Sequence, residues 1–208
     1  MQSPAATAPN SQSHVRDLAR TETDRQLTAL LVAIAQGKQE AFTDFYDQSN
    51  RLVFSLALRI LNDRGLAEEV TTDVYMQVWR QAGNFEAVRG TPLSWLMTIA
   101  RTRSIDRLRS SSHLRQETES LDVVMHHAVT ADNPERNTLY TERQKLVRAA
   151  LNQLLPEQRR LIESAYFEGL SQSELAEKFN LPLGTVKTRV RAGMLVLKNY
   201  LSAQFLES

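Results

Sequence analysis

The stretch SELAEKFNLPLGTVKTRVRAG, residues Ser173 to Gly193, decides the fold of the second half of the chain. Around its start, Ser171–Glu174 matches a capping box, in which a serine and a glutamate satisfy backbone donors at a helix start. The helix that begins there has an apolar side, and residues 180–183 then suit a tight turn. A second helix continues the core contacts with Val186, Val190, Leu195 and Leu197. The pattern predicts a helix-turn-helix.

The second helix of this pair has a basic polar side and no acid between Pro182 and Lys198. A recognition helix presents such side chains to the major groove of DNA from its N-terminal half. Gly184 would let the backbone approach a phosphate, and the helix N-terminus adds partial positive charge. The alternative is a packed helical hairpin with a solvated basic face. The residues that we predict to bind DNA are Thr185, Lys187, Thr188, Arg189 and Arg191.

The composition is that of an ordinary folded protein. The chain has 208 residues, of which 42% are hydrophobic and 24% charged, and its formal net charge is +1. Because the net charge is so small, affinity for nucleic acid has to come from local clusters of basic residues. The absence of cysteine excludes disulfides and thiolate metal sites. No apolar run approaches the roughly 20 residues of a membrane span, and we expect a cytoplasmic protein.

The first half of the chain predicts four helices. Residues 1–24 are rich in Ser, Thr, Ala and Pro, and we expect them to form a disordered tail. Thr91 and Pro92 are a typical N-cap and first helical residue, so the fourth helix begins there. The helices make up a first domain over residues 25–109. Before Thr91, apolar residues recur at helical spacing in three segments, which are 27–37, 42–61 and 66–83.

The fourth helix changes character halfway along. Its first half is apolar, whereas its second half carries one acid, Asp106, and a cluster of arginines that favours anions, namely Arg101, Arg103, Arg107 and Arg109. Residues 110–137 mix serines, acids and a proline, and we predict a flexible linker there. Residues 138–208 form the second domain. The chain is therefore predicted to be all-α, with two small helical domains of which the second contains the helix-turn-helix.

Three stretches, taken in order, resemble a known family. They are AEEVTTDVYMQVW (67–79), FEAVRGTPLSWLMTIARTRSIDRLR (85–109) and LPEQRRLIESAYFEGLSQSELAEKFNLPLGTVKTRV (155–190). From about Leu27 to Leu201 the chain resembles the extracytoplasmic-function (ECF) sigma factors, the small two-domain initiation subunits of bacterial RNA polymerase. It departs from the family pattern at Thr72 and Asp73, where Gln-Glu is common, and at residues 192–194, where Arg-Ala-Arg often stands.

The resemblance implies a role for each domain. The first would bind core RNA polymerase through Glu69, Thr72, Asp73 and Gln77. It would also recognise and melt the downstream promoter element, with a loop that captures a flipped base and arginines that hold the strand, namely Asn84, Phe85, Arg89, Arg101, Arg103 and Arg107. The second domain would read the upstream promoter element, with Gln172 and Ser173 reaching phosphates. An anti-sigma factor, often membrane-anchored in this family, would hold the protein inactive until an envelope or stress signal.

Other features suggest no catalytic or metal site. Trp79 and Trp95 are interpreted as core residues, whereas Phe85 stays open between core packing and base stacking. His126 and His127 lack helical ligand spacing and a third donor, so no metal is expected. With no catalytic constellation we expect no enzyme activity, no cofactor and no small-molecule substrate. The alternative to an initiation factor is a self-sufficient helix-turn-helix regulator that binds duplex DNA without polymerase.

Overall fold

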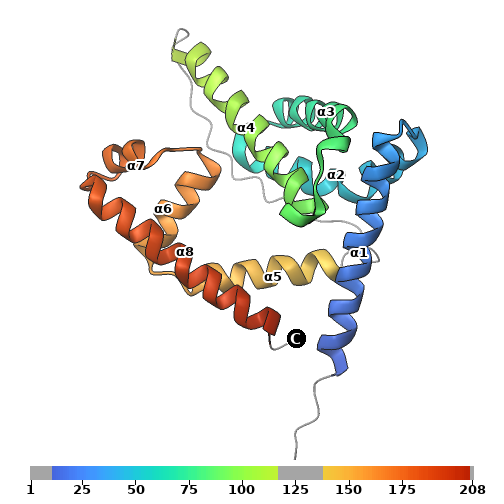
Figure 1. Cartoon of the computed structure of the whole chain (residues 1–208). Coiled ribbons are helices and arrows are strands. Elements are labelled where there is room, and N and C mark those ends of the chain that lie inside the picture. Colours follow the sequence, from blue (N-terminus) through green and yellow to red (C-terminus); the bar gives the residue numbers. More distant parts are fainter. Residues whose placement is uncertain (1–10, 117–137, 207–208) are drawn as a thin grey trace, which may run out of the picture.

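The computed structural model describes residues 11–116 and 138–206 and places two helical domains there (Figure 1). The first domain contains α1 (Ser11–Ala35), α2 (Gln39–Leu61), α3 (Arg64–Gln81), two short 3-10 turns, η1 (Ala82–Asn84) and η2 (Ala87–Arg89), and α4 (Pro92–Gln116). The second contains α5 (Thr138–Asn152), α6 (Pro156–Phe167), α7 (Gln172–Lys178) and α8 (Leu183–Leu206). Every regular element in the two described ranges is helical, which confirms the all-α prediction.

The core of the first domain lies between α1, α2, α3 and α4. Phe45 and Val53 of α2 are fully buried at its centre, and α3 and α4 pack both on α2 and on each other. Further fully buried side chains come from the other three helices and include Leu27, Leu31, Val74, Val78 and Leu96. Burial of such side chains stabilises a fold by about 1.5–3 kcal/mol each. This core fixes α3 and α4 side by side.

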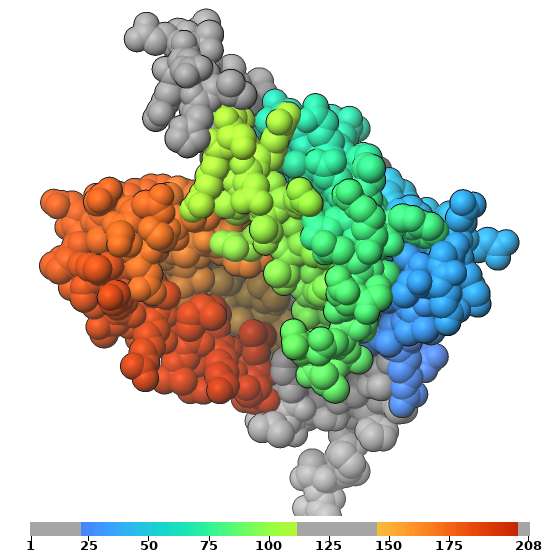
Figure 2. All heavy atoms as spheres, turned by 45° about the horizontal axis from the view of Figure 1, so that its top comes forward, coloured from blue at the N-terminus to red at the C-terminus, as the bar shows by residue number. Residues whose placement is uncertain are grey.

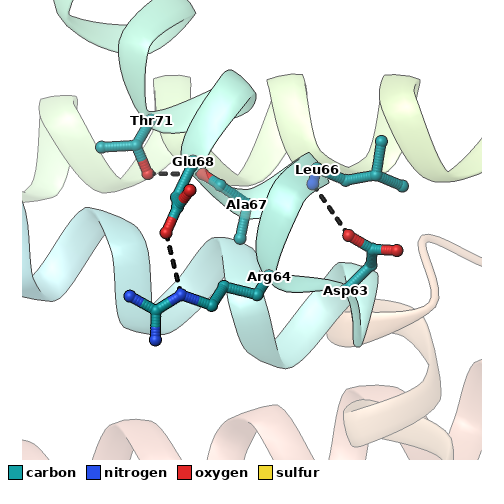
Figure 3. Close-up of polar contacts among 6 residues, drawn as sticks. All are labelled: Asp63, Arg64, Leu66, Ala67, Glu68 and Thr71. Carbon is teal, nitrogen blue, oxygen red and sulfur yellow. Dashed lines mark hydrogen bonds and ion pairs between the residues drawn. The ribbon is translucent and has the colours of Figure 1, made fainter.

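The boundary between α2 and α3 follows from local chemistry. Asn62 adopts a left-handed conformation, with φ of 52°, and its N–H donates to the Leu58 carbonyl, which ends α2. Asp63 then caps α3, because its Oδ1 accepts from the backbone N–H of Leu66 at 2.9 Å (Figure 3). Arg64 Nε donates to Glu68 at 2.9 Å across the first turn (Figure 3). Asn62 and Asp63 thus set where α2 ends and where α3 begins.

Two helices extend beyond the predicted domain boundaries. Residues 11–24, expected in a disordered tail, belong to α1, which begins at Ser11. The expected linker loses residues 110–116 to α4, which continues to Gln116. Neither helix contains a proline or glycine beyond its first residue, and once a helix has a nucleus each further residue adds a hydrogen bond. Residues 1–10 and 117–137, with His126 and His127, lie outside the described residues.

The second domain has a small core of its own. Leu161, Leu175 and Val186 are buried together, one from each of α6, α7 and α8. Leu195, predicted to face this core, is 56% exposed instead, because it lies on the side of α8 opposite the buried Val186. Close packing of α8 on α6 relies on Gly193, where a Cβ would lie 2.6 Å from Ile162 Cδ1. In the described ranges, no helix is both long and apolar enough to span a membrane.

Candidate nucleic-acid interface

The capping box at the start of α7 forms as predicted. Ser171 Oγ accepts from the Glu174 backbone N–H at 3.3 Å, and the Ser171 N–H donates to the Glu174 carboxylate at 2.6 Å. The Ser171 hydroxyl and backbone N–H lower the pKa of the Glu174 carboxyl, because they stabilise its charged form. Because α7 has only seven residues, Gln172–Lys178, its stability depends on these hydrogen bonds to the backbone groups of its first turn.

The turn between α7 and α8 sets the direction of the second helix. Asn180 takes a left-handed conformation with φ of 49°, and the N–H of Leu181 donates to the Ala176 carbonyl at 2.9 Å. The Pro182 carbonyl accepts from Thr185 at 2.9 Å, which starts α8. Burial of Val186 then turns the opposite side of α8 toward solvent. These contacts make the predicted helix-turn-helix.

The predicted upstream contacts lie together on the outer surface of α7 and α8. Thr185 and Arg189 are half-buried, whereas the other six are exposed, namely Gln172, Ser173, Gly184, Lys187, Thr188 and Arg191. Although no acid follows Arg189 within α8, α6 supplies one, because Arg189 Nη2 lies 3.7 Å from Glu157 Oε1. The expectation that the basic face lacks an acidic partner is therefore wrong for Arg189, since sequence spacing does not show a neighbouring helix.

Two arginines of α4 pair with α3 in the same domain. Arg103 Nε donates to the Gln77 side chain at 2.7 Å, and Arg107 Nη2 donates to the Glu69 carboxylate at 2.7 Å. Both partners are residues that the resemblance assigns to polymerase binding. The two predicted sites of the first domain therefore share one continuous surface across α3 and α4.

The rest of the predicted polymerase-binding set lies on the same side of α3. Positions 69, 72, 73 and 77 are spaced three, four and eight residues from the first, which places them on one helix face. Thr72 and Asp73 are exposed, and the Thr72 hydroxyl donates to the Glu68 carbonyl at 3.1 Å. Asp73 therefore presents a carboxylate to solvent at the middle of this face.

The loop between α3 and α4 divides its side chains between core and solvent. Phe85 packs on the first core, with its ring edge-on to Trp95 at a centroid distance of 5.8 Å. Asn84 and Arg89 are exposed, and Arg89 pairs with Glu86 at 2.9 Å. Trp95 lies in the core region as predicted, whereas Trp79 packs edge-on against Phe42 but remains 38% exposed. Sequence reasoning did not single out Val88, which is 92% exposed at the loop tip.

Two other arginines of α4 contact the second domain. Arg101 and Arg109 donate to backbone carbonyls of Ala165, Tyr166 and Gly169 at 2.7–2.8 Å. Arg59 of α2, which sequence reasoning missed, lies 3.7 Å above the Phe167 ring. No local pattern in the sequence marks Arg59, because its partner comes from the other domain.

Comparison with protein families identifies both domains. Residues 45–113 match the family model described as Sigma-70 region 2, and residues 144–197 match the model described as Sigma-70, region 4. Together these matches cover more than half of the chain. The first contains α3, the loop and most of α4, and the second contains the helix-turn-helix.

Characterised relatives cover nearly the same span. The chain is 37% identical to the ECF RNA polymerase sigma factor SigK of Mycolicibacterium vanbaalenii, over 85% of this chain and 89% of the relative. It is 34% identical to the SigK of Mycobacterium tuberculosis strain H37Ra, over 84% of this chain and 93% of the relative.

Solved structures give a weaker likeness. Rhodobacter sphaeroides SigE in complex with the anti-sigma ChrR is 29% identical, over 84% of this chain and 98% of that one, with a TM-score of 0.43. CnrH in complex with the cytosolic domain of CnrY is 18% identical, over 86% and 98%, with a TM-score of 0.37. Scores this low carry no argument about how the two domains are arranged.

Proposed function

The chain belongs to the extracytoplasmic-function RNA polymerase sigma factors of the sigma-70 family, and from this premise we propose which of its surfaces performs each part of initiation. A member of this family directs transcription initiation and is not an enzyme. Its partners are core RNA polymerase and promoter DNA. The proposal therefore concerns which residues make the contacts.

The α7–α8 pair reads the upstream promoter element. The observation that carries this assignment is the outward face of α8, where Lys187, Thr188 and Arg191 are exposed while Val186 is buried. The major groove admits such a helix, and lysine or arginine there recognises guanine edges. At the start of α8, Gly184 leaves open space in which a phosphate backbone can approach the helix N-terminus. The Gln172 and Ser173 side chains add phosphate contacts that fix the register.

The loop over residues 84–90 and the arginines of α4 hold the melted downstream element. Asn84 and Arg89 are exposed polar residues of the loop, where Arg89 pairs with Glu86, and the Phe85 ring packs edge-on against Trp95. A flipped base needs a pocket with polar and stacking groups, because unstacking costs a few kcal/mol. The strand backbone then follows Arg101, Arg103 and Arg107 on α4.

The exposed face of α3 binds core polymerase. Glu69, Thr72, Asp73 and Gln77 form a polar strip with an acidic centre, which suits a basic partner surface. Glu69 and Gln77 also pair with arginines of α4. Polymerase docking and strand holding are thus physically connected through two side-chain pairs.

A reconstituted transcription assay tests the upstream assignment. Core RNA polymerase and the purified chain first select the cognate promoter from fragmented genomic DNA of the source organism. Lys187→Ala and Arg191→Ala should then each lower initiation from it about tenfold, because a good base contact contributes about 1–3 kcal/mol. Binding to core should not change. Lys198→Ala, at an exposed lysine about three turns further along α8 than Lys187, is the matched control. An equal loss of initiation there would mean that these residues act through the overall positive charge of α8 and not by reading bases.

Binding to core polymerase without DNA tests the α3 assignment. Asp73→Arg should weaken association, because it places like charges against a basic partner. Asp44→Arg, the same charge reversal at another exposed aspartate on α2, should leave association unchanged. If both variants bind as the natural chain does, the docking surface lies elsewhere. If the natural chain binds duplex DNA alone and not core, the self-sufficient regulator is the better description.

Two further parts of the proposal rest on family membership alone. The first is an anti-sigma partner, in some cases anchored in a membrane, that holds the protein inactive until a signal arrives. The second is a cytoplasmic site of action, where RNA polymerase and promoter DNA are present. Co-purification of the chain from its own organism, with and without envelope stress, tests the first.

A further inference from the structure

A pocket of about 410 Å³ lies where the C-terminal end of α2 meets α6 and α7. Arg59 of α2 is its lining residue from the first domain, and the others belong to α6 and α7 or to the residues that cap their C-terminal ends. Figure 2 shows the second domain lying against α4 of the first. Pockets of roughly 300–1,000 Å³ hold small-molecule ligands. This one is therefore large enough for such a ligand, and it is complete only while the two domains are in contact.

The acidic groups of the pocket already have cationic partners. The Glu168 carboxylate accepts a hydrogen bond from the Ser164 hydroxyl at 3.0 Å and pairs with Lys178. The Glu163 carboxylate pairs with Arg159 Nε at 3.0 Å. Because cations of the second domain offset both carboxylates, the positive charges of the two other arginines that line the pocket are left over.

Those two arginines, Arg59 and Arg160, contact aromatic rings instead of acids. The guanidinium carbon of Arg59 lies 3.7 Å from the centre of the Phe167 ring, and that of Arg160 lies 5.4 Å from the centre of the Phe179 ring. Within residues 11–116 and 138–206, these ring contacts are the only polar or electrostatic interactions of the two guanidinium groups. A guanidinium that lies over a ring keeps its N–H donors in its own plane, where the ring does not use them. Each domain thus contributes one positive group with unused donors to the pocket.

A phosphate group matches these donors best. A guanidinium can donate two parallel hydrogen bonds to a phosphate, and a phosphate has enough oxygens to accept from two arginines at once, whereas a carboxylate has only two. We propose that the pocket binds a phosphate group, free or carried by a small organic molecule, with Arg59 and Arg160 as its donors. The Phe167 and Phe179 rings line the same pocket and favour the organic phosphate, because its apolar part can be buried against them. The ligand touches both domains and stabilises their contact.

Calorimetric titration of the full chain, with neither DNA nor polymerase present, tests the site and its ligand class. The probes are AMP, inorganic phosphate and adenosine at equal ionic strength. AMP should bind about tenfold more tightly than inorganic phosphate, because only AMP also buries apolar surface. Adenosine, which lacks the phosphate, should not bind measurably. Equal affinities for AMP and inorganic phosphate would assign the site to free phosphate. Adenosine binding as tightly as AMP, or no binding of either phosphate, overturns the proposal.

Substitutions locate the bound phosphate. Arg59→Gln and Arg160→Gln should each weaken AMP binding about tenfold, because each removes charge-assisted hydrogen bonds. Arg51→Gln on α2 and Arg148→Gln on α5, at exposed arginines outside the pocket, are the matched controls and should leave AMP binding unchanged. An equal loss in all four variants would mean that AMP responds only to the overall positive charge, and a loss in Arg160→Gln alone would mean that the first domain contributes nothing. Either result overturns the shared site.

Hydrogen exchange provides a test without substitutions. AMP at about ten times its Kd should slow the exchange of amides in α6 and α7 about tenfold, because opening of these helices releases the ligand. Exchange in α3, which does not line the pocket, should stay the same. Unchanged exchange in α6 and α7, or equal slowing in α3, places AMP outside this pocket and overturns the proposal.

Discussion

Gly193 shows how a single residue sets the packing of the helix-turn-helix domain. In Gly193→Ala the new Cβ would lie 2.6 Å from Ile162 Cδ1 and 3.2 Å from Gln158 Cβ. Overpacking of this kind costs about 1–3 kcal/mol, against about 1 kcal/mol gained from helix propensity. We expect a net loss of about 1 kcal/mol in the free energy of unfolding, measured by denaturant titration. Gly184→Ala, where a Cβ meets nothing, should be neutral or stabilising, and equal effects of the two would contradict the packing role.

Glu174 makes the start of α7 sensitive to acid. Its pKa is lowered from an ordinary value of 4.5 by the Ser171 hydroxyl and N–H. A carboxyl with a lowered folded pKa contributes stability above its ordinary pKa and loses it as pH falls through the folded value. The second domain should therefore lose stability below pH 4.5. Glu174→Gln, whose amide oxygen still accepts from Ser171, should show less of this loss in thermal melts between pH 7 and pH 3. Glu177→Gln leaves the capping box intact and should melt as the natural chain does.

On the scale of helices, an acidic residue of α6 competes with DNA for Arg189 of α8. Glu157 of α6 lies 3.7 Å from Arg189, and exposed pairs of this kind are worth up to about 1 kcal/mol. Glu157→Gln should therefore tighten binding to the upstream element up to about fivefold, because Arg189 no longer has a competing anion. The effect is measured as the affinity of the protein, together with core polymerase, for promoter DNA that contains the upstream element, at fixed salt. Glu163→Gln, which removes the partner of Arg159 on the same helix, should give no gain, and a gain in both variants would indicate general charge instead.

Helix ends with local signals could be predicted from the sequence. Ser171 with Glu174, Thr91 before Pro92, and Asn62 each act on backbone groups within four residues, so their spacing is enough. The start of α1 could not be predicted. The polar composition of residues 11–24 favoured a disordered tail, whereas the helix extends through them from its buried part, which begins at Leu27. The exposure of Leu195, by contrast, does follow from helical spacing, since at 3.6 residues per turn it lies about two and a half turns from the buried Val186 and so on the opposite face.

For the molecule as a whole, the sequence predicted two domains and the residue types of each site but not how the sites connect. Arg103 with Gln77 and Arg101 with Ala165 join residues far apart in the chain, and no spacing rule relates such pairs. Phe85 was open between core and base stacking for the same reason, and its contact with Trp95 places it against the core.

The two domains should differ in stability yet remain coupled. The first has a core drawn from four helices, whereas the buried cluster of the second is Leu161, Leu175 and Val186. In hydrogen exchange on the full chain, amides of α2 and α3 should therefore exchange last, and those of α7 should open at lower free energy. Phe167→Ala should speed exchange in α6 and α7 roughly tenfold, because a half-buried ring that packs against the core of the first domain contributes about 1–2 kcal/mol. Exchange in α2 and α3 should stay unchanged, since their core survives without that ring. A uniform rise across both domains would mean that the chain unfolds as one unit, and no rise would mean that Phe167 does not couple them.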